Sequence, residues 1–159
     1  MKSLSTARKT FAAILLGTLL TAGAIAQGPT PKHIYPEISA AQHDLDAAIA
    51  LAHRQHKRVL VDFGGDWCGD CQVLDIYAHQ APNDQLLAKY FVKVNINIGH
   101  IDTNFDIAKR CGVDLHGVPA LAVLSPAGKV LYAQETGEFR DMRHMEPNSV
   151  TEFLDEWKS

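Results

Sequence analysis

The amino-acid sequence predicts an α/β domain with a mixed central sheet and helices on both faces of that sheet. An apolar run at residues 59–63, broken by one carboxylate and closed by two glycines, is typical of a central strand buried on both faces. A strand of alternating apolar residues at 92–98 follows a helical pattern, which indicates a parallel βαβ unit. A predicted β-hairpin at residues 120–132 adds antiparallel strands.

Five helical segments are expected where apolar residues recur at helical spacing, at residues 40–56, 73–77, 84–89, 105–112 and 150–157. Ser39 is the expected N-cap of the first helix, and Asn148 or Ser149 is that of the last. Ser125-Pro126-Ala127-Gly128 is the expected hairpin turn. With residues 84–89 counted together with the helical segment before them, the predicted order is α-β-α-β-α-β-β-α, without an internal repeat.

The first 26 residues, 1–26, have the layout of a secretory signal peptide. A short basic region precedes an apolar stretch at residues 11–20, and Ala24-Ile25-Ala26 satisfies the small-x-small cleavage rule. We therefore expect cleavage between Ala26 and Gln27, and a protein that works in the periplasm or outside the cell. An uncleaved membrane anchor is the alternative, although the apolar stretch is short for a span of about 20 residues.

Charge excludes two classes of partner. Removal of Lys2, Arg8 and Lys9 with the signal peptide reduces the 15 basic residues to 12 against 18 acidic ones, so the formal net charge falls from −3 to −6. An acidic protein without a basic run does not neutralise phosphates, so nucleic acid and anionic lipid are not expected partners. We expect a monomer, with a Pro-rich extended lead-in at residues 27–38 and a folded domain at residues 39–159.

Three cysteines are too few for a disulfide scaffold in a domain of this size. Cys68 and Cys71 form a C-x-x-C pair between the predicted buried strand and a helix, whose N-terminus stabilises a thiolate at Cys68. Cys71 lies on the same helical face, and Asp62, in the strand behind the pair, is placed to accept its proton. A redox-active pair, half of a zinc site and a structural disulfide all remain open at this point. Cys111 is expected to be a small buried apolar residue.

The segment Val61-Asp62-Phe63-Gly64-Gly65-Asp66-Trp67-Cys68-Gly69-Asp70-Cys71 resembles the active-site segment of the thioredoxin superfamily. Further along the chain, Gly117-Val118-Pro119, followed by the apolar residues 120–124, resembles that family's cis-proline loop and the strand after it. The hairpin turn and the last helix match as well, so the resemblance covers roughly residues 40–159. It implies a thioredoxin-like fold and thiol–disulfide oxidoreductase activity.

The resemblance also assigns roles to individual residues. The catalytic set comprises Cys68 as the nucleophile, Cys71 as the resolving thiol, Asp62 as the buried acid and Pro119 as the cis-proline. Substrate contacts fall to the flanking aromatic residue and the cis-proline loop, that is Trp67, Gly117, Val118 and Pro119. Four neighbours are expected to tune the redox pair: Gly69, Asp70, Lys93 and His116. No bound cofactor or metal is implied. Electrons are expected to pass from an upstream dithiol donor, for which a membrane protein is a candidate, to protein disulfides.

Asp70 stands where cytoplasmic thioredoxins usually have proline, and it predicts a direction for the reaction. A carboxylate beside Cys68 disfavours the thiolate by like-charge repulsion. Because a less stabilised thiolate makes a less oxidising disulfide, this favours a reductase or isomerase over a disulfide donor. Extra residues around 97–102 and a longer link at 137–147 make the chain more similar to secreted bacterial thioredoxin-like proteins than to cytoplasmic thioredoxin.

Two other function classes remain open. Met142-Arg143-His144-Met145, together with the cysteine pair or His116, offers thioether and imidazole groups that suit copper. A periplasmic copper-binding protein is therefore the first alternative. A redox-inert interaction domain that has kept the fold is the second.

Overall fold

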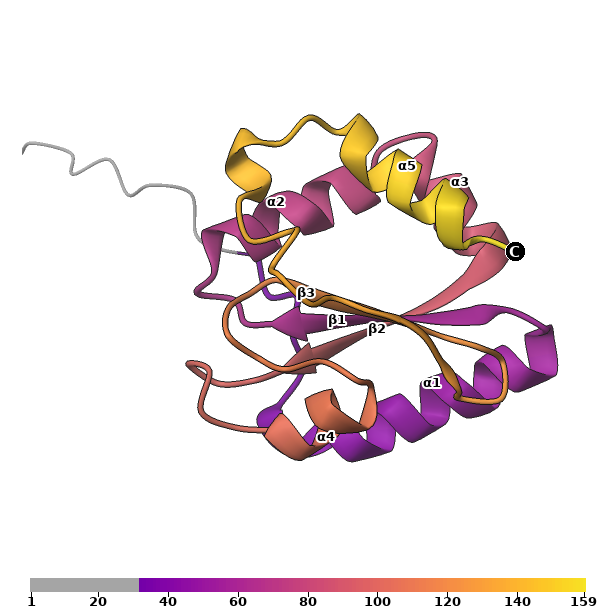
Figure 1. Ribbon diagram of the computed structural model, residues 1–159, viewed down its shortest axis with the longest axis horizontal. Helices are drawn as coiled ribbons and strands as arrows, with labels where there is room; N and C mark the ends of the chain where they lie inside the picture. Colours follow the sequence, from indigo (N-terminus) through magenta and orange to yellow (C-terminus); the bar gives the residue numbers. More distant parts are fainter. Residues whose placement is uncertain (1–31) are drawn as a thin grey trace, which may run out of the picture. The chain divides into compact units, whose positions relative to one another are not determined.

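A four-stranded sheet in the order β2-β1-β3-β4 lies at the centre of the molecule (Figure 1). In the computed structural model, which describes residues 32–159, the strands are β1 (Arg58–Gly64), β2 (Phe91–Asn97), β3 (Ala120–Leu124) and β4 (Val130–Ala133). β1 pairs in parallel with β2 and antiparallel with β3, and β3 pairs antiparallel with β4. This arrangement confirms the predicted mixed sheet, in which a parallel βαβ unit is joined to an antiparallel hairpin.

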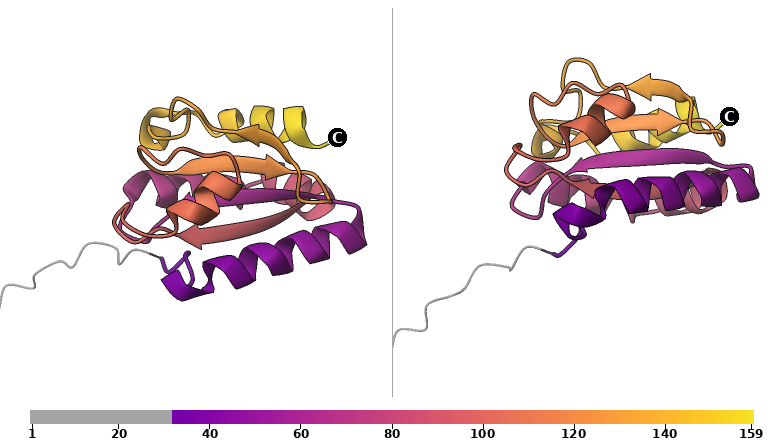
Figure 2. Two further views of the ribbon diagram at one scale, coloured as in Figure 1. Left: turned by 60° about the horizontal axis from the view of Figure 1, so that its bottom comes forward. Right: turned by 90° about the horizontal axis from the view of Figure 1, so that it is seen from below.

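Helices cover both faces of this sheet. The elements are η1 (Ile38–Ala40), α1 (Ala41–Gln55), α2 (Gly69–Ala78), α3 (Asn83–Tyr90), α4 (Phe105–Arg110), η2 (Met142–His144) and α5 (Asn148–Trp157). α1 and α4 lie on one face, and α2, α3 and α5 lie on the other (Figures 1 and 2). Within residues 32–159, no helix combines the length and the apolar character needed to cross a membrane.

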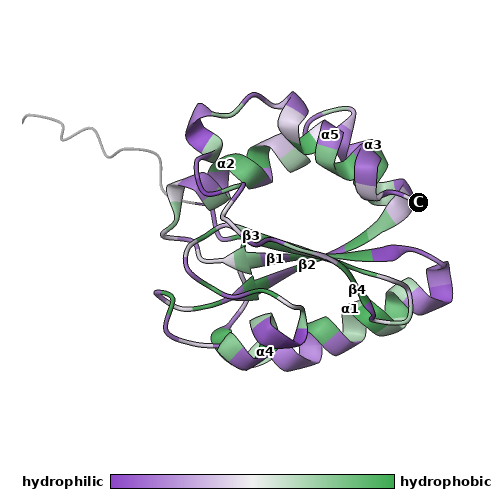
Figure 3. Cartoon of the chain, in the orientation of Figure 1, coloured by the Kyte–Doolittle hydropathy of each residue, from purple (hydrophilic) through white to green (hydrophobic). Residues whose placement is uncertain are grey.

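The two faces of the sheet bury separate apolar clusters. Side chains alternate along β1, so Val59, Val61 and Phe63 pack with α1 and α4, whereas Leu60 packs with α2, α3 and α5. By the same alternation Asp62 lies on the α2 face, where it is fully buried. Figure 3 shows hydrophobic residues along the strands and a mixture of hydrophobic and hydrophilic residues on the helices, as amphipathic packing requires.

Both predicted N-caps are wrong. Ser39 lies inside η1, which runs directly into α1, so Ala40 occupies the N-cap position without a side-chain hydrogen bond. The last helix already begins at Asn148, with Pro147 as its N-cap. In both places a turn leads straight into the helix, which the spacing of apolar residues does not reveal.

The described part of the predicted lead-in packs against the edge of the sheet. Asn95 and Asn97 of β2, the edge strand, donate from Nδ2 to the carbonyl oxygens of Ile34 and Pro36 at 3.0 and 2.8 Å. Tyr35, between them, is fully buried in the core. Residues 32–38 therefore belong to the folded unit, while the predicted signal peptide lies outside the described residues.

Candidate active site

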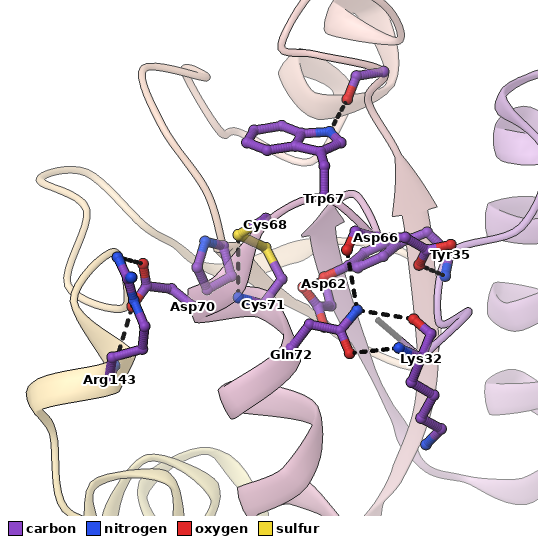
Figure 4. Close-up of a disulfide and its surroundings, with 12 residues drawn as sticks. Lys32, Tyr35, Asp62, Asp66, Trp67, Cys68, Asp70, Cys71, Gln72 and Arg143 are labelled. Carbon is purple, nitrogen blue, oxygen red and sulfur yellow. Dashed lines mark hydrogen bonds and ion pairs between the residues drawn. A yellow bond between two sulfur atoms is a disulfide. The ribbon is translucent and has the colours of Figure 1, made fainter. Parts of the chain in front are cut away.

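Cys68 and Cys71 form a disulfide at the start of α2 (Figure 4). Cys68 is the N-cap of the helix, its Sγ accepts a hydrogen bond from the backbone N of Cys71 at 3.1 Å, and the two Cα atoms are 5.2 Å apart. The helix N-terminus therefore points its free N–H groups at the sulfur of Cys68, as predicted. Cys68 is 5% exposed and Cys71 is 0% exposed, so the expected attacking cysteine is only slightly more open than its partner.

Asp62 lies beneath this pair without any exposure to solvent. Its Oδ1 accepts a hydrogen bond from the hydroxyl of Tyr35 at 2.9 Å, and its Oδ2 lies 3.2 Å from Nζ of Lys93. The 3.2 Å contact lacks the geometry of a hydrogen bond, so we treat it as an ion pair that offsets the charge of the buried carboxylate. The predicted proximity of Lys93 to the acid is confirmed.

Tyr35 is the part of this site that the sequence did not reveal. Its hydroxyl oxygen lies 2.4 Å, and Cys71 Sγ 2.8 Å, from the point that a Cβ on Gly64 would occupy. Only a glycine at this position leaves room for both the Tyr35 phenol and the Cys71 sulfur. Desolvation, reinforced by the charge of Asp62, raises the pKa of Tyr35 well above its ordinary value, so its hydroxyl keeps its proton.

Asp66 fixes the segment that carries Tyr35. Its carboxylate accepts hydrogen bonds from the backbone N of Ile34 at 2.8 Å and of Tyr35 at 3.0 Å, and from His33 Nδ1 at 2.6 Å. Partial burial opposes ionisation, but these donors outweigh it and hold the pKa of Asp66 below its ordinary value. Asp66, which directly precedes Trp67, thus links the lead-in to the active-site loop.

Asp70 is paired, contrary to the prediction from the sequence. Its carboxylate is not an unpaired charge beside Cys68, because it is buried against Arg143 of η2. Arg143 donates from its backbone N (3.0 Å), Nε (3.1 Å) and Nη2 (3.1 Å) (Figure 4). Desolvation opposes ionisation, but the hydrogen bonds from Arg143 prevail and lower the pKa of Asp70. A Cβ on Gly69 would lie 3.7 Å from the Arg143 side chain, so the guanidinium covers the dipeptide between the two cysteines.

Trp67 forms an exposed aromatic platform beside the disulfide. Its Nε1 donates to the carbonyl oxygen of Gly99 at 2.6 Å, and its ring stacks on His100 with centroids 5.1 Å apart. Gly65 makes room for the indole, because a Cβ there would lie 2.5 Å from Nε1. The extra residues around 97–102 therefore hold Trp67, which remains 47% exposed.

The predicted cis-proline loop is present. The Val118–Pro119 peptide bond is cis, and the Pro119 carbonyl oxygen accepts from Nε2 of the buried Gln134 at 3.2 Å. Gln134 also accepts from the backbone N of Leu121 through Oε1, so it links the loop to β3, a role that sequence reasoning missed. Gly117 lies under Arg140, whose Cδ would be 2.3 Å from a Cβ at that position.

His116 lies on the protein surface. Its side chain is 72% exposed, and Nε2 lies 3.0 Å from the Asp114 carboxylate. Within residues 32–159, no hydrogen bond or ion pair joins it to either cysteine. The role of His116 in tuning the redox pair therefore stays a prediction.

The other sulfur-containing side chains near the site pack into the core. Cys111 is buried, and desolvation raises the pKa of its thiol to about 11, as expected for an unreactive apolar residue. Met142 is fully buried, and Met145 packs against the same apolar cluster. Among the described residues, no group of three or more His, Cys, Asp or Glu side chains is arranged to hold a metal ion.

Residues 40–126, more than half of the chain, match the sequence model of a family described as thioredoxin-like. The chain belongs to this thioredoxin-like family. The crystal structure of a disulphide isomerase from Xylella fastidiosa Temecula1 is similar, with a TM-score of 0.75 and 32% sequence identity over 80% of this chain and 98% of that chain. The predicted fold class and the membership of a disulfide oxidoreductase family are therefore confirmed.

A curated relative, a thioredoxin H-type of Chlamydomonas reinhardtii, is 33% identical over 52 residues. That match takes in 33% of this chain and 46% of the relative, so the chain spans about half the length of the curated relative. The roles assigned to individual residues of this thioredoxin-like protein remain predictions.

Proposed function

We propose that this protein is an exported thiol–disulfide oxidoreductase that reduces or rearranges disulfides in other proteins. The Cys68–Cys71 disulfide at the N-terminus of α2, backed by the buried Asp62, is the observation that supports the proposal most directly. Cys68, as a thiolate, attacks a substrate disulfide, and Cys71 then resolves the mixed disulfide. The reaction returns the oxidised pair and requires no bound cofactor.

The balance of charge around the pair supports a reductase or isomerase rather than an oxidase. Arg143 offsets Asp70, and Lys93 offsets Asp62, so neither side adds a net positive charge to the helix N-terminus. Strong oxidants depend on a strongly stabilised reduced form, whereas here the helix N-terminus acts on the Cys68 thiolate without an added net positive charge. The name of the Xylella relative, a disulphide isomerase, agrees with this direction. We expect a reduction potential closer to about −270 mV than to about −120 mV.

The proposal extends to compartment and partners. The basic, apolar and small-residue regions within residues 1–26 support export with cleavage after Ala26. A reductase in an oxidising compartment needs an upstream dithiol donor, for which a membrane protein is the candidate. Protein disulfides are the proposed substrates, taken from the side of the site where Trp67 is exposed.

Insulin reduction and redox titration of the mature chain test the proposal. Cys68→Ser should abolish turnover, and Cys71→Ser should accumulate mixed disulfides with substrate, because its second step cannot occur. Cys111→Ala is the matched control, since it removes a buried cysteine outside the pair and should retain turnover.

Two outcomes would contradict this proposal in different ways. Full insulin reduction by Cys68→Ser would remove the mechanism. A potential near about −120 mV would leave the mechanism intact and overturn the direction.

A further inference from the structure

Three groups from separate parts of the chain meet below the disulfide. Tyr35 comes from the lead-in, Asp62 from β1 and Cys71 from α2. The Tyr35 hydroxyl donates to Asp62 Oδ1 at 2.9 Å. The same hydroxyl and Cys71 Sγ both lie within 2.8 Å of the empty Cβ position of Gly64, so they are close neighbours. The hydroxyl is thus a neighbour of both the Cys71 sulfur and the Asp62 carboxylate.

We propose that Tyr35 relays the proton of the Cys71 thiol to Asp62 during resolution of the mixed disulfide. The inference rests on the proposed function, which makes Cys71 the resolving thiol. The Cys71 S–H gives its proton to the Tyr35 oxygen while the Tyr35 O–H proton passes to Asp62 Oδ1. The Cys71 sulfur then attacks Cys68 Sγ and forms the Cys68–Cys71 bond. The bond between Cys68 and the substrate sulfur breaks, and the substrate leaves as a thiolate that takes a proton from water.

The surroundings of Tyr35 suit a relay better than a base. Burial keeps its hydroxyl protonated, so it can only accept one proton as it gives another away. The charged groups near it are Asp62 on β1, Asp66 before α2, Asp75 on α2 and, across Asp62, Lys93 on β2. Three of these four are carboxylates, which oppose ionisation of the phenol.

The buried acid lies close to an open groove. Asp62 has no contact with solvent, but the side chain of Lys93, 3.2 Å away, is 17% exposed. Lys93 and Asn95 line an open groove between the lead-in and β2, together with Lys32 and His79. Lys93 is a cation and cannot accept a proton from Asp62, but its exposed side chain shows that water in this groove, the final acceptor, comes within one residue of the acid.

The test separates attack from resolution in the reduced mature protein. Reaction with dithionitrobenzoate releases one thionitrobenzoate when Cys68 attacks and a second when Cys71 resolves. Tyr35→Phe keeps the ring and removes only the hydroxyl. It should leave the first phase unchanged, slow the second by about tenfold or more at neutral pH, and shift the pH midpoint of that phase upward. Tyr77→Phe is the matched control, since it removes a hydroxyl that donates to the Met145 carbonyl at 3.2 Å, outside the site.

A double variant distinguishes a relay from two independent effects. If Tyr35 acts through Asp62, Asp62→Asn should slow the second phase, and adding Tyr35→Phe should slow it little further. Additive effects, or a Tyr35→Phe second phase with the wild-type rate and pH profile, would overturn the relay alone. The wild-type second phase should also be slower in D2O, and an equal rate would overturn the relay even if Tyr35→Phe folded poorly. Absence of any second phase in the wild type would overturn the proposed function with it.

Discussion

At the scale of single residues, the ion pair between Asp70 and Arg143 decides what the C-x-x-C motif can do. Asp70 taken alone destabilises a thiolate at Cys68, and Arg143 taken alone stabilises it. Together they lie over the dipeptide between the cysteines with their charges offset. The reductase direction therefore no longer rests on repulsion by Asp70. It rests on the absence of a net positive charge at this position.

Removal of the Asp70 charge and removal of the Arg143 charge should shift the reduction potential in opposite directions. Asp70→Asn leaves the Arg143 cation uncompensated, so the thiolate gains stability and the potential becomes less negative. Arg143→Gln uncovers the Asp70 carboxylate, so the potential becomes more negative. Each shift should be about 30 mV, which corresponds to one unit in the pKa of Cys68. Equilibration with dithiothreitol buffers measures both potentials.

The control for these variants is Arg110→Gln, which breaks an exposed ion pair with Asp46 at 2.8 Å, on α4 and α1. It should leave the potential unchanged. Shifts of the same sign for Asp70→Asn and Arg143→Gln would contradict an electrostatic effect and indicate a change of packing instead.

At the scale of elements, the lead-in completes both the edge of the sheet and the site. It supplies Tyr35, and Asp66 holds it through the backbone N atoms of Ile34 and Tyr35. Because the folded-state pKa of Asp66 is lowered, the unfolded chain binds the proton more readily than the folded chain. The stability that Asp66 contributes is thus complete above the unfolded pKa of about 4, and it is lost as the pH falls through the lower folded value.

Acid should therefore weaken the attachment of this element. We expect the free energy of unfolding in urea to fall between pH 5 and pH 3 (approximate limits), with about 1 kcal/mol of the fall due to Asp66. Asp66→Asn does not titrate, so its fall should be smaller by that amount. The comparison variant is Asp46→Asn, whose carboxyl also has a lowered pKa but lies on the exposed surface of α1. Because solvent screens its interactions, the fall in this variant should stay closer to that of the wild type. An equal fall in Asp66→Asn and wild type would show that Asp66 does not anchor the lead-in.

At the scale of the whole molecule, the sequence predicts the order of strands and helices and the place of the cysteine pair. Periodicity and turn residues carry that information, because they depend on neighbours in the chain. Side-chain contacts between segments that are far apart in the sequence do not depend on such neighbours and cannot be predicted in this way. Tyr35 lies 27 residues from Asp62, and Arg143 lies 73 residues from Asp70. Nothing local marks either residue, so the sequence alone predicts an extended lead-in and an unpaired charge at Asp70.

Export is the property of the whole chain that can still be tested directly. The expected removal of residues 1–26 takes away three basic residues and changes the formal net charge from −3 to −6. Expression of the full chain in a bacterial host, followed by fractionation and intact-mass measurement, should give a periplasmic product that begins at Gln27. Leu16→Arg places a charge in the apolar stretch, where it opposes membrane insertion by about 3 kcal/mol, and should leave uncleaved precursor in the cytoplasm. A wild-type product that retains residues 1–26 in the membrane fraction would favour an anchored enzyme instead.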